Sequence, residues 1–276
     1  MKVTETRAEL AEALAGIPRE DIKLVPTMGA LHEGHLSLVK AAKRSGGTVV
    51  VSIFVNPTQF NDPNDLRSYP RTPEKDLGML EREGADVVFM PSVTEVYPEP
   101  DTRVFDFGQL DKVMEGATRQ GHFNGVAQVV SRLFDMVKPS QAFFGQKDFQ
   151  QVAVVKEMTR QLGMEVEIVE CPIVREADGL AMSSRNVLLA PEYRKAAPDI
   201  YRALRLGAEK AGAMPPRDLE RWVIGEAERN GLLKVIYFRI VDAGTLADIE
   251  NWDTPRRQGC IAVQAGSVRL IDNIRY

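Results

Sequence analysis

The sequence predicts an α/β protein with a doubly wound parallel sheet, followed by a smaller unit of the α+β class. In the first two-thirds of its 276 residues, short apolar runs of strand length alternate with stretches of helical spacing, and such alternation is typical of βαβ units. After Val174 the order changes, because two helical stretches precede three strand-like runs. Apolar residues make up 44% and charged residues 27% of the chain, which is the balance of a globular protein rather than a disordered one.

Each element expected in the first part depends on apolar spacing or on a helix-starting residue. Leu10 and Leu14 are four residues apart, which is a helical spacing, and Pro73 suits the first turn of a helix. The strands are expected at residues 22–25, 48–55, 86–90, 142–144 and 166–169, and the helices at 4–14, 34–44, 73–83, 125–137 and 148–162.

The second part is expected to hold helices at 191–213 and 216–230 and strands at 235–241, 260–265 and 268–271. Helices followed by sequential strands favour a separate α+β unit. We therefore place a boundary near Val174, with a Rossmann-like domain at residues 1–174 and a smaller C-terminal domain at 175–276.

Charge and cysteine content restrict the partners and the compartment. Lys and Arg number 35 against 39 Asp and Glu, so the basic excess of most nucleic-acid-binding proteins is missing. No apolar stretch approaches the ~18 residues of a transmembrane helix, and the N-terminus lacks the apolar core of a signal peptide. Cys171 and Cys260 are too few for a disulfide framework. We expect a cytoplasmic protein that binds small molecules rather than nucleic acid or membrane.

The most informative segment is residues 26–39, PTMGALHEGHLSLV. A helix is expected to begin near Gly34, so His32 and His35 lie at or just before its N-terminus. Free backbone N–H groups and the helix dipole favour an anion there, and Gly29 and Gly34 permit close approach and unusual backbone angles. Two imidazoles can donate hydrogen bonds to phosphate oxygens. The segment therefore predicts phosphate binding.

A zinc site is one alternative for these histidines. A helical zinc motif usually has two histidines four apart and a catalytic glutamate, whereas His32 and His35 are three apart. His122 is available as a third ligand. A purely structural role is the other alternative, although two of the chain's three histidines flank a single glycine. Metal binding stays open at this point.

Two further segments carry cations suited to phosphate. In residues 143–151, FFGQKDFQQ, a strand and a glycine again precede a helix, which places Lys147 near the helix start and allows Asp148 to cap it. In residues 181–186, AMSSRN, two hydroxyls and Arg185 can donate hydrogen bonds to phosphate oxygens.

Neutral polar side chains suited to an organic substrate follow two of the strands. The segment 54–60, FVNPTQF, combines Gln59 and a neighbouring asparagine with apolar side chains, and Gln151 lies one helical turn beyond the lysine described above. Two long connections, 56–72 and 175–186, are expected to be mobile binding loops. The second joins the two domains, so the C-terminal domain is expected to close over a ligand.

Six stretches together resemble the pantothenate synthetase (pantoate–β-alanine ligase) family. In the family's order they are PTMGALHEGHLSLV, FVNPTQF, YPRTPEKDL, GHFNGVAQVV, FFGQKDFQQ and READGLAMSSRN. The family belongs to a nucleotidyltransferase group that includes class I aminoacyl-tRNA synthetases. Residues 32–35 look like that group's His-x-Gly-His motif, and residues 182–185 look like its second motif, which more often reads Lys-Met-Ser-Lys. Ala181 stands where the first lysine would be, so Arg185 and Lys147 are the expected cations.

The resemblance implies an ATP-dependent condensation of (R)-pantoate with β-alanine to pantothenate, AMP and pyrophosphate. Pantoate's carboxylate first attacks the α-phosphate to give pantoyl adenylate, and the amine of β-alanine then displaces AMP. ATP enters as a substrate with Mg²⁺, and no covalent protein nucleophile is required. The resemblance also implies a homodimer.

The resemblance further implies which residues act on these ligands. The expected catalytic residues are His35, His32, Lys147 and Arg185. The residues expected to bind ATP are Met28, Gly29, Ala30, Leu31, His32, Glu33, Gly34, His35, Gly145, Gln146, Lys147, Asp148, Val174, Met182, Ser183, Ser184 and Arg185. Gln59 and Gln151 are expected to bind pantoate, and Gln59 also β-alanine. His35 is expected either to donate a proton or to stabilise charge in the transition state.

Three other functions are weighed against this one. A related adenylyltransferase would retain AMP in its product, and the six ordered stretches disfavour it. A class I aminoacyl-tRNA synthetase is disfavoured by the length and the acidic balance of the chain. A nucleotide-binding module without turnover would bind ATP but release no AMP. Pantoate-dependent release of AMP would distinguish the ligase from such a module.

Overall fold

The computed structural model describes residues 1–276, which form two compact units. Unit 1 comprises Met1–Phe107, Arg119–Gln146 and Gln151–Pro172, and unit 2 comprises Gly108–Thr118, Lys147–Gln150 and Ile173–Tyr276. No sequence pattern predicted the two short segments that unit 2 takes from the middle of the chain. What each predicted domain does stays a prediction at this stage.

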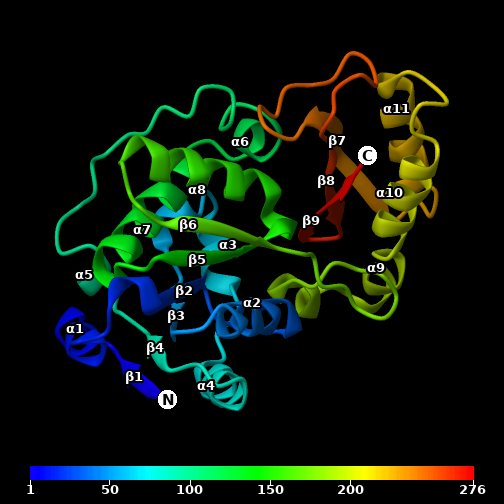
Figure 1. Cartoon of the computed structure of the whole chain (residues 1–276). Coiled ribbons are helices and arrows are strands. Elements are labelled where there is room, and N and C mark those ends of the chain that lie inside the picture. The colour runs from blue at the N-terminus through cyan, green and yellow to red at the C-terminus, as the bar shows by residue number, and fades with distance from the viewer. The chain divides into compact units, whose positions relative to one another are not determined.

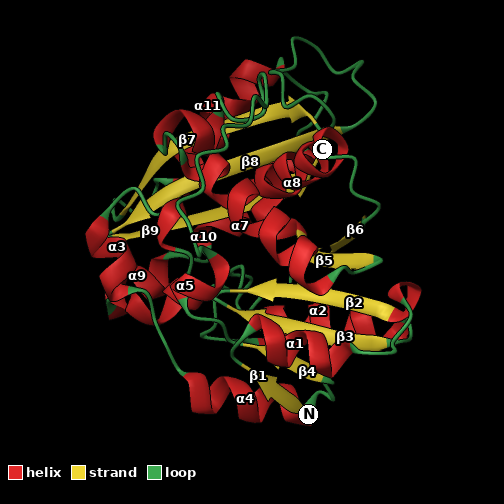
Figure 2. Cartoon of the chain, turned by 90° about the vertical axis from the view of Figure 1, so that its left-hand side faces the viewer, coloured by secondary structure: helices red, strands yellow, loops and turns green.

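Unit 1 contains a parallel sheet of six strands in the order β1-β4-β3-β2-β5-β6 (Figure 1, Figure 2). The strands are β1 (Lys2–Thr4), β2 (Ile22–Thr27), β3 (Thr48–Ile53), β4 (Val87–Phe89), β5 (Gln141–Gly145) and β6 (Glu167–Cys171). Leu24, Val25 and Val50 are fully buried, as expected for strands covered on both faces. The strand order reverses between β2 and β5, and ligands bind at such a switch point in open α/β sheets.

Helices cover both faces of this sheet. In Figure 1, α2 and α4 lie on one face and α1, α7 and α8 on the other. The helices are α1 (Arg7–Leu14), α2 (Glu33–Arg44), α3 (Pro63–Ser68), α4 (Pro73–Arg82), α5 (Val93–Val96), α7 (His122–Val137) and α8 (Phe149–Gln161), whose first two residues belong to unit 2. Leu36 and Val39 of α2 pack with Val25 and Val51 of the sheet, so the apolar spacing of α2 anchors the segment that precedes it.

The N-terminal residues differ from the single helix predicted over residues 4–14. Lys2–Thr4 form the edge strand β1, which pairs with β4. Helix α1 begins at Arg7 because Thr6 caps it: the Thr6 hydroxyl accepts from Glu9 N, and the Glu9 carboxylate accepts from Thr6 N. A strand of three residues carries too little alternation to be predicted from sequence.

The connection at 56–72 is also more regular than the predicted loop. Pro57–Gln59 form a 3-10 turn, and Pro63–Ser68 form α3. Each begins with a proline, whose fixed φ suits a first helical turn.

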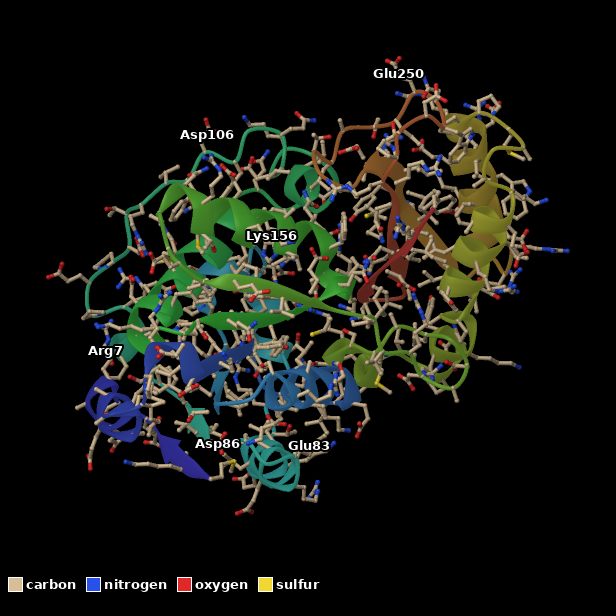
Figure 3. All side chains as sticks on the ribbon, in the orientation of Figure 1. Arg7, Glu83, Asp86, Asp106, Lys156 and Glu250 are labelled. Atoms are coloured by element: carbon tan, nitrogen blue, oxygen red, sulfur yellow. The ribbon has the colours of Figure 1, made fainter.

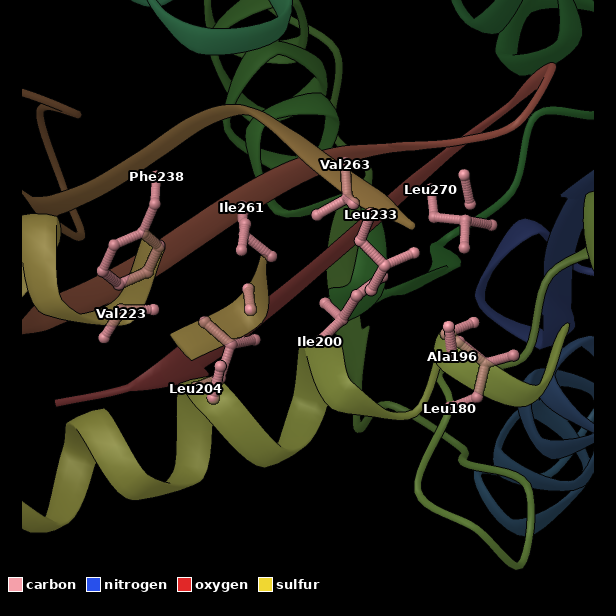
Figure 4. Packing of buried hydrophobic residues seen from close by; sticks show 14 of the residues in the cluster. Leu180, Ala196, Ile200, Leu204, Val223, Leu233, Phe238, Ile261, Val263 and Leu270 are labelled. Carbon is pink, nitrogen blue, oxygen red and sulfur yellow. The ribbon is translucent and has the colours of Figure 1, made fainter. Parts of the chain in front are cut away.

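Unit 2 contains an antiparallel sheet in the order β7-β8-β9, formed by β7 (Leu233–Asp242), β8 (Arg257–Ala265) and β9 (Val268–Arg275). Its helices are α6 (Met114–Thr118), α9 (Pro191–Ala196), α10 (Asp199–Glu209) and α11 (Pro216–Ala227). Ile200, Leu204 and Val223 pack against Phe238 and Ile261 of the sheet (Figure 4). The doubly wound parallel sheet and the smaller α+β unit predicted from the sequence are thus confirmed.

One predicted helix of unit 2, at 191–213, is instead two helices. Pro198 lies between α9 and α10. Proline has no N–H to continue the helical hydrogen bonds, and its ring clashes with the preceding turn. The break is therefore a consequence of that residue.

Charged side chains lie around the outside of unit 1 (Figure 3). Glu83 pairs with Lys40 at 3.3 Å, and Asp86 pairs with Lys43 at 3.1 Å. None of the helices combines the length and the apolar composition needed to cross a membrane.

Candidate active site

The two histidines of the HEGH motif lie at the N-terminus of α2, directly after the central strand β2. His32 is the N-cap residue, and its Nδ1 accepts a hydrogen bond from Gly34 N at 3.1 Å. The neutral ring then carries its proton on Nε2, which is a donor. The His35 ring lies in the first turn, with its centroid 4.1 Å from that of His32. The predicted position of both residues at a helix start is confirmed.

The backbone before this helix contains two consecutive left-handed residues. Gly29 has φ +80°, as its glycine identity suggested, but Gly34 lies in regular helix and the second left-handed residue is Ala30, with φ +49°. Gly34 therefore does not use the unusual backbone angles that a glycine permits. An L-residue in this conformation is strained, so something must hold Ala30 in place.

Asp76 provides that restraint. Its carboxylate accepts from Ala30 N and from Leu31 N, each at 2.8 Å, and from the Thr72 hydroxyl at 3.0 Å. The residue is 1% exposed, so these bonds form out of water. Sequence reasoning missed Asp76, although it lies in the YPRTPEKDL stretch that carries part of the family resemblance.

Gln59 is held by neighbours from three segments of unit 1. Its Nε2 donates to Met28 Sδ at 3.1 Å, and its Oε1 accepts from Asn56 Nδ2 at 3.2 Å. Its main-chain oxygen lies 2.7 Å from His122 Nδ1. The 3-10 turn approaches α7 closely, because a Cβ at Gly125 would lie 2.5 Å from the Thr58 carbonyl oxygen. Gln59 thus lies against the loop that follows β2.

Both ring nitrogens of His122, the third ligand of the zinc alternative, contact other residues of unit 1. Its Nε2 lies 3.2 Å from Arg119 Nη1, while its other ring nitrogen faces the Gln59 backbone. Residues 1–276 contain no group of three or more His, Cys, Asp and Glu side chains arranged to hold a metal ion.

The segment 143–151 begins on β5, which lies beside the strand β2 that leads into the HEGH motif. Leu24 of β2 lies opposite Ala142 of β5, so the chain leaving β5 at Gly145 and Gln146 emerges next to the chain leaving β2. Gln151 follows as the third residue of α8 and is half-buried.

Lys147 and Asp148 belong to unit 2 and lie in a 3-10 turn that precedes α8. The Lys147 side chain is 19% exposed, and its Nζ lies 3.5 Å from Asp148 Oδ1. A helical turn after a glycine therefore presents the lysine much as the sequence predicted, although α8 itself begins at Phe149.

The predicted loop at 175–186 contains a short hairpin. Met182 N donates to the Val174 carbonyl at 3.0 Å, and Arg175 and Ala181 form an antiparallel bridge. Gly179, with φ +96°, lies in the turn. Val174 and Met182, both predicted to bind ATP, are eight positions apart in the sequence. The hairpin brings them side by side.

The hairpin leads into a second capped turn. Ser183 caps the 3-10 helix Ser184–Leu188, and its Oγ accepts from Arg185 N at 3.3 Å. Asn186 Nδ2 donates to Glu176 Oε1 at 2.9 Å, which joins the two ends of the predicted loop.

The predicted site residues therefore form two sets. Unit 1 holds Met28, Gly29, Ala30, Leu31, His32, Glu33, Gly34, His35, Gln59, Gly145, Gln146 and Gln151, and unit 2 holds Lys147, Asp148, Val174, Met182, Ser183, Ser184 and Arg185.

Comparisons with known proteins give one consistent result. Residues 2–275 match the family model described as Pantoate-beta-alanine ligase. The chain is 55% identical over 279 residues to a pantothenate synthetase of Porphyromonas gingivalis, covering 100% of this chain and 99% of that protein. It is 52% identical over 280 residues to a pantothenate synthetase of Phocaeicola vulgatus, with the same coverage.

Two solved structures are similar over nearly the whole chain. A pantothenate synthetase from Thermus thermophilus superposes with a TM-score of 0.93 at 47% identity, covering 99% of each chain. A pantoate-beta-alanine ligase from Francisella tularensis, complexed with beta-gamma ATP and beta-alanine, superposes with a TM-score of 0.84 at 33% identity, covering 100% of this chain and 97% of that one.

Proposed function

Because the chain belongs to the pantoate–β-alanine ligase family, we propose that the two sets of residues described above carry its reaction. The enzyme condenses (R)-pantoate with β-alanine at the expense of ATP, giving pantothenate, AMP and pyrophosphate through a pantoyl-adenylate intermediate. In the proposed assignment, cations, imidazoles and the N-terminal end of α2 bind the nucleotide, and two glutamines bind pantoate.

One observation supports the nucleotide assignment most strongly: His32 caps α2 and His35 lies in its first turn, at the switch point of the sheet. The positive end of the α2 dipole attracts phosphate, and the Nε2–H of His32 is a donor for phosphate oxygens. His35 lies against His32, so both imidazoles act on the same group. In this proposal, residues 28–35 bind ATP.

The remaining nucleotide contacts are proposed for residues of both units. Gly145 to Asp148, Val174 and Met182 to Arg185 bind ATP, and Lys147 and Arg185 neutralise charge that develops on the phosphates. Mg²⁺ enters with the triphosphate as part of the substrate. The chain offers it no cluster of three carboxylate or imidazole ligands, so phosphate oxygens are its proposed ligands.

Neutral glutamines suit the substrate carboxylate. Gln59 and Gln151 orient pantoate by hydrogen bonds, whereas a tight arginine or lysine clamp would lower the reactivity of the carboxylate that attacks the α-phosphate. Gln59 is preorganised by Met28 and Asn56, and it is also proposed to contact β-alanine. In the second step the amine of β-alanine attacks the acyl carbon and AMP leaves.

His35 is assigned to the adenylation step, either as a proton donor or as a charge stabiliser.

The remaining proposals concern the cellular compartment and the oligomeric state of the enzyme. Both cysteines are reduced and buried, which suits the cytoplasm, and the family resemblance supports a homodimer.

The test separates the two half-reactions. ATP–pyrophosphate exchange should require pantoate but not β-alanine, and AMP release in the full reaction should require all three substrates. Lys147→Ala should lower the exchange rate by about 10²–10³, because a well-placed charge-stabilising donor contributes that much. Its rate with supplied pantoyl adenylate and β-alanine should change far less. Gln59→Ala should impair both half-reactions.

Matched controls are available on α8. Lys156→Ala removes a lysine that pairs with Glu170 at the surface, and Gln161→Ala removes an amide at the helix end that donates to the Asp106 carbonyl. Both should exchange normally. Normal exchange by Lys147→Ala would overturn the assignment of the lysine. Exchange that requires β-alanine would overturn the two-step reaction.

A further inference from the structure

The C-terminal strand β9 reaches the main chain of Lys147. Residues of a strand point alternately to opposite faces of the sheet. Val268 and Leu270 belong to the hydrophobic core that the sheet shares with α10 and α11, and Leu270 is labelled in Figure 4. Arg269 points to the other face, where it bonds with Glu115 of α6. Asn273, four residues further on, lies on this second face as well.

Asn273 holds Lys147 by its backbone. Asn273 Nδ2 donates to the Lys147 carbonyl oxygen at 2.9 Å, and Asn273 Oδ1 accepts from Gln258 Nε2 at 2.7 Å. Because an amide nitrogen of Gln258 donates to the oxygen end of Asn273, the donor end of Asn273 must face Lys147. Asn273 and Gln258 are 2% and 3% exposed, so no water competes for these bonds.

Asn273 is itself held in place by its neighbour Asp272, on the other face of β9. Asn273 N bonds to Asp272 Oδ1 at 2.7 Å. The Asp272 carboxylate receives two bonds from Arg175, at 2.6 and 3.0 Å, and Arg175 stacks 3.6 Å above the Tyr201 ring. Neighbouring side chains thus hold the strand from both sides at the point where it bonds to Lys147.

The segment that bears Lys147 has a second attachment one turn later. Gln150 is 6% exposed, and its Oε1 accepts from Glu115 N at 3.0 Å while its Nε2 donates to the carbonyls of Leu110 and Val113. Gln150 fixes the start of α8, whereas Asn273 fixes the turn at Lys147 itself. Neither attachment uses the Lys147 ammonium group, whose Nζ lies 3.5 Å from Asp148 Oδ1.

We infer that Asn273 is a positioning residue for the adenylation step, which it serves by holding Lys147. The inference rests on the role proposed above for that lysine. Asn273 is not assigned any contact with substrate, so its removal acts through Lys147. A displacement of about 1 Å in a catalytic group costs up to about 10²-fold in rate, and the loss of this one buried bond permits such a displacement.

The test uses Asn273→Asp in the full chain. The side chain has the same shape and still accepts from Gln258, but in its ionised form it cannot donate to the Lys147 carbonyl. We expect at least about a tenfold fall in kcat for pantoate-dependent exchange, and less than about a threefold change with supplied pantoyl adenylate and β-alanine. The matched control is Gln264→Glu, an amide-to-carboxylate change at the β8–β9 turn, where Gln264 donates to the Gly266 carbonyl; it should exchange normally.

A double-mutant cycle with Lys147→Ala separates positioning from a general loss of stability. If Asn273 acts through the lysine, Asn273→Asp should slow residual exchange less than about threefold further in the Lys147→Ala background. Losses that multiply would overturn the positioning role while leaving Lys147 catalytic. Normal exchange by Lys147→Ala alone would overturn both the lysine's role and this inference. If circular dichroism shows that Asn273→Asp does not fold, Asn273→Ser enters the same cycle under the same criterion.

Discussion

Replacing Asp76 should release the loop that precedes α2. In Asp76→Asn the side chain keeps one acceptor oxygen, so it can still serve Leu31 N and Thr72, while its new amide N–H faces Ala30 N. Hydrogen bonds to charged groups contribute roughly 1.5–3 kcal/mol each, and an unpaired buried donor adds a cost. We therefore expect the free energy of unfolding to fall by about 2 kcal/mol in Asp76→Asn and about 4 kcal/mol in Asp76→Ala.

The left-handed backbone of Ala30 allows a second, independent substitution. Ala30 at φ +49° costs roughly 1–2 kcal/mol relative to a right-handed conformation, and glycine avoids most of that cost. Ala30→Gly should therefore recover part of the stability and of the ATP affinity that Asp76→Asn loses. Urea unfolding and calorimetric titration with ATP measure the two quantities.

Glu74→Gln is a control on α4, the helix that also carries Asp76. Glu74 is exposed on α4, and exposed substitutions usually change stability by less than about 0.5 kcal/mol. An Asp76→Asn enzyme with unchanged unfolding energy and unchanged ATP affinity would refute the restraint on residues 28–32.

Three further predictions concern other parts of the chain. Burial raises the pKa of the Cys171 and Cys260 thiols, which keeps both protonated, so a folded Cys171→Ser, Cys260→Ser enzyme should turn over at a near-normal rate; a hundredfold loss would contradict this. Hydrogen bonds from Arg103, and also from Arg132, lower the pKa of Asp101, so its contribution to stability is present above the ordinary Asp pKa of about 3.9 and lost as the pH falls below it. Asp101→Asn should therefore be less stable at neutral pH and lose stability less steeply in acid, as thermal unfolding across pH would measure. Active enzyme should contain no stoichiometric zinc, and elemental analysis that found zinc essential for activity would restore the metal alternative.

Local chemistry made much of the fold predictable. The central strands β2, β3 and β4 contain short apolar runs because both their faces are buried, and fully buried residues such as Val50 are typical of such strands. The turns at the carboxyl ends of β2 and β5 were predictable because glycine, histidine and lysine stand where a strand gives way to a helix. Pro198 shows the limit of periodicity, since one residue divides a continuous helical pattern into α9 and α10.

The supporting residues were not predictable because their contacts are distant in sequence. Asp76 bonds to a backbone 46 positions away, and Asn273 to one 126 positions away. Neither side chain differs in type from an ordinary surface aspartate or asparagine, so only the folded chain distinguishes them. The left-handed backbone at Ala30 was likewise hidden, because alanine has no preference for that conformation.

The construction of unit 2 from three stretches of chain limits how the protein can be divided. A fragment starting at Ile173 would carry Arg269 and Tyr237 without Glu115, the carboxylate that both side chains bond to in the whole protein. The same fragment would lack Gln150 and the lysine that Asn273 anchors. The sheet of unit 2 therefore cannot be transplanted as a module, and its last contacts depend on parts of the polypeptide synthesised long before its strands.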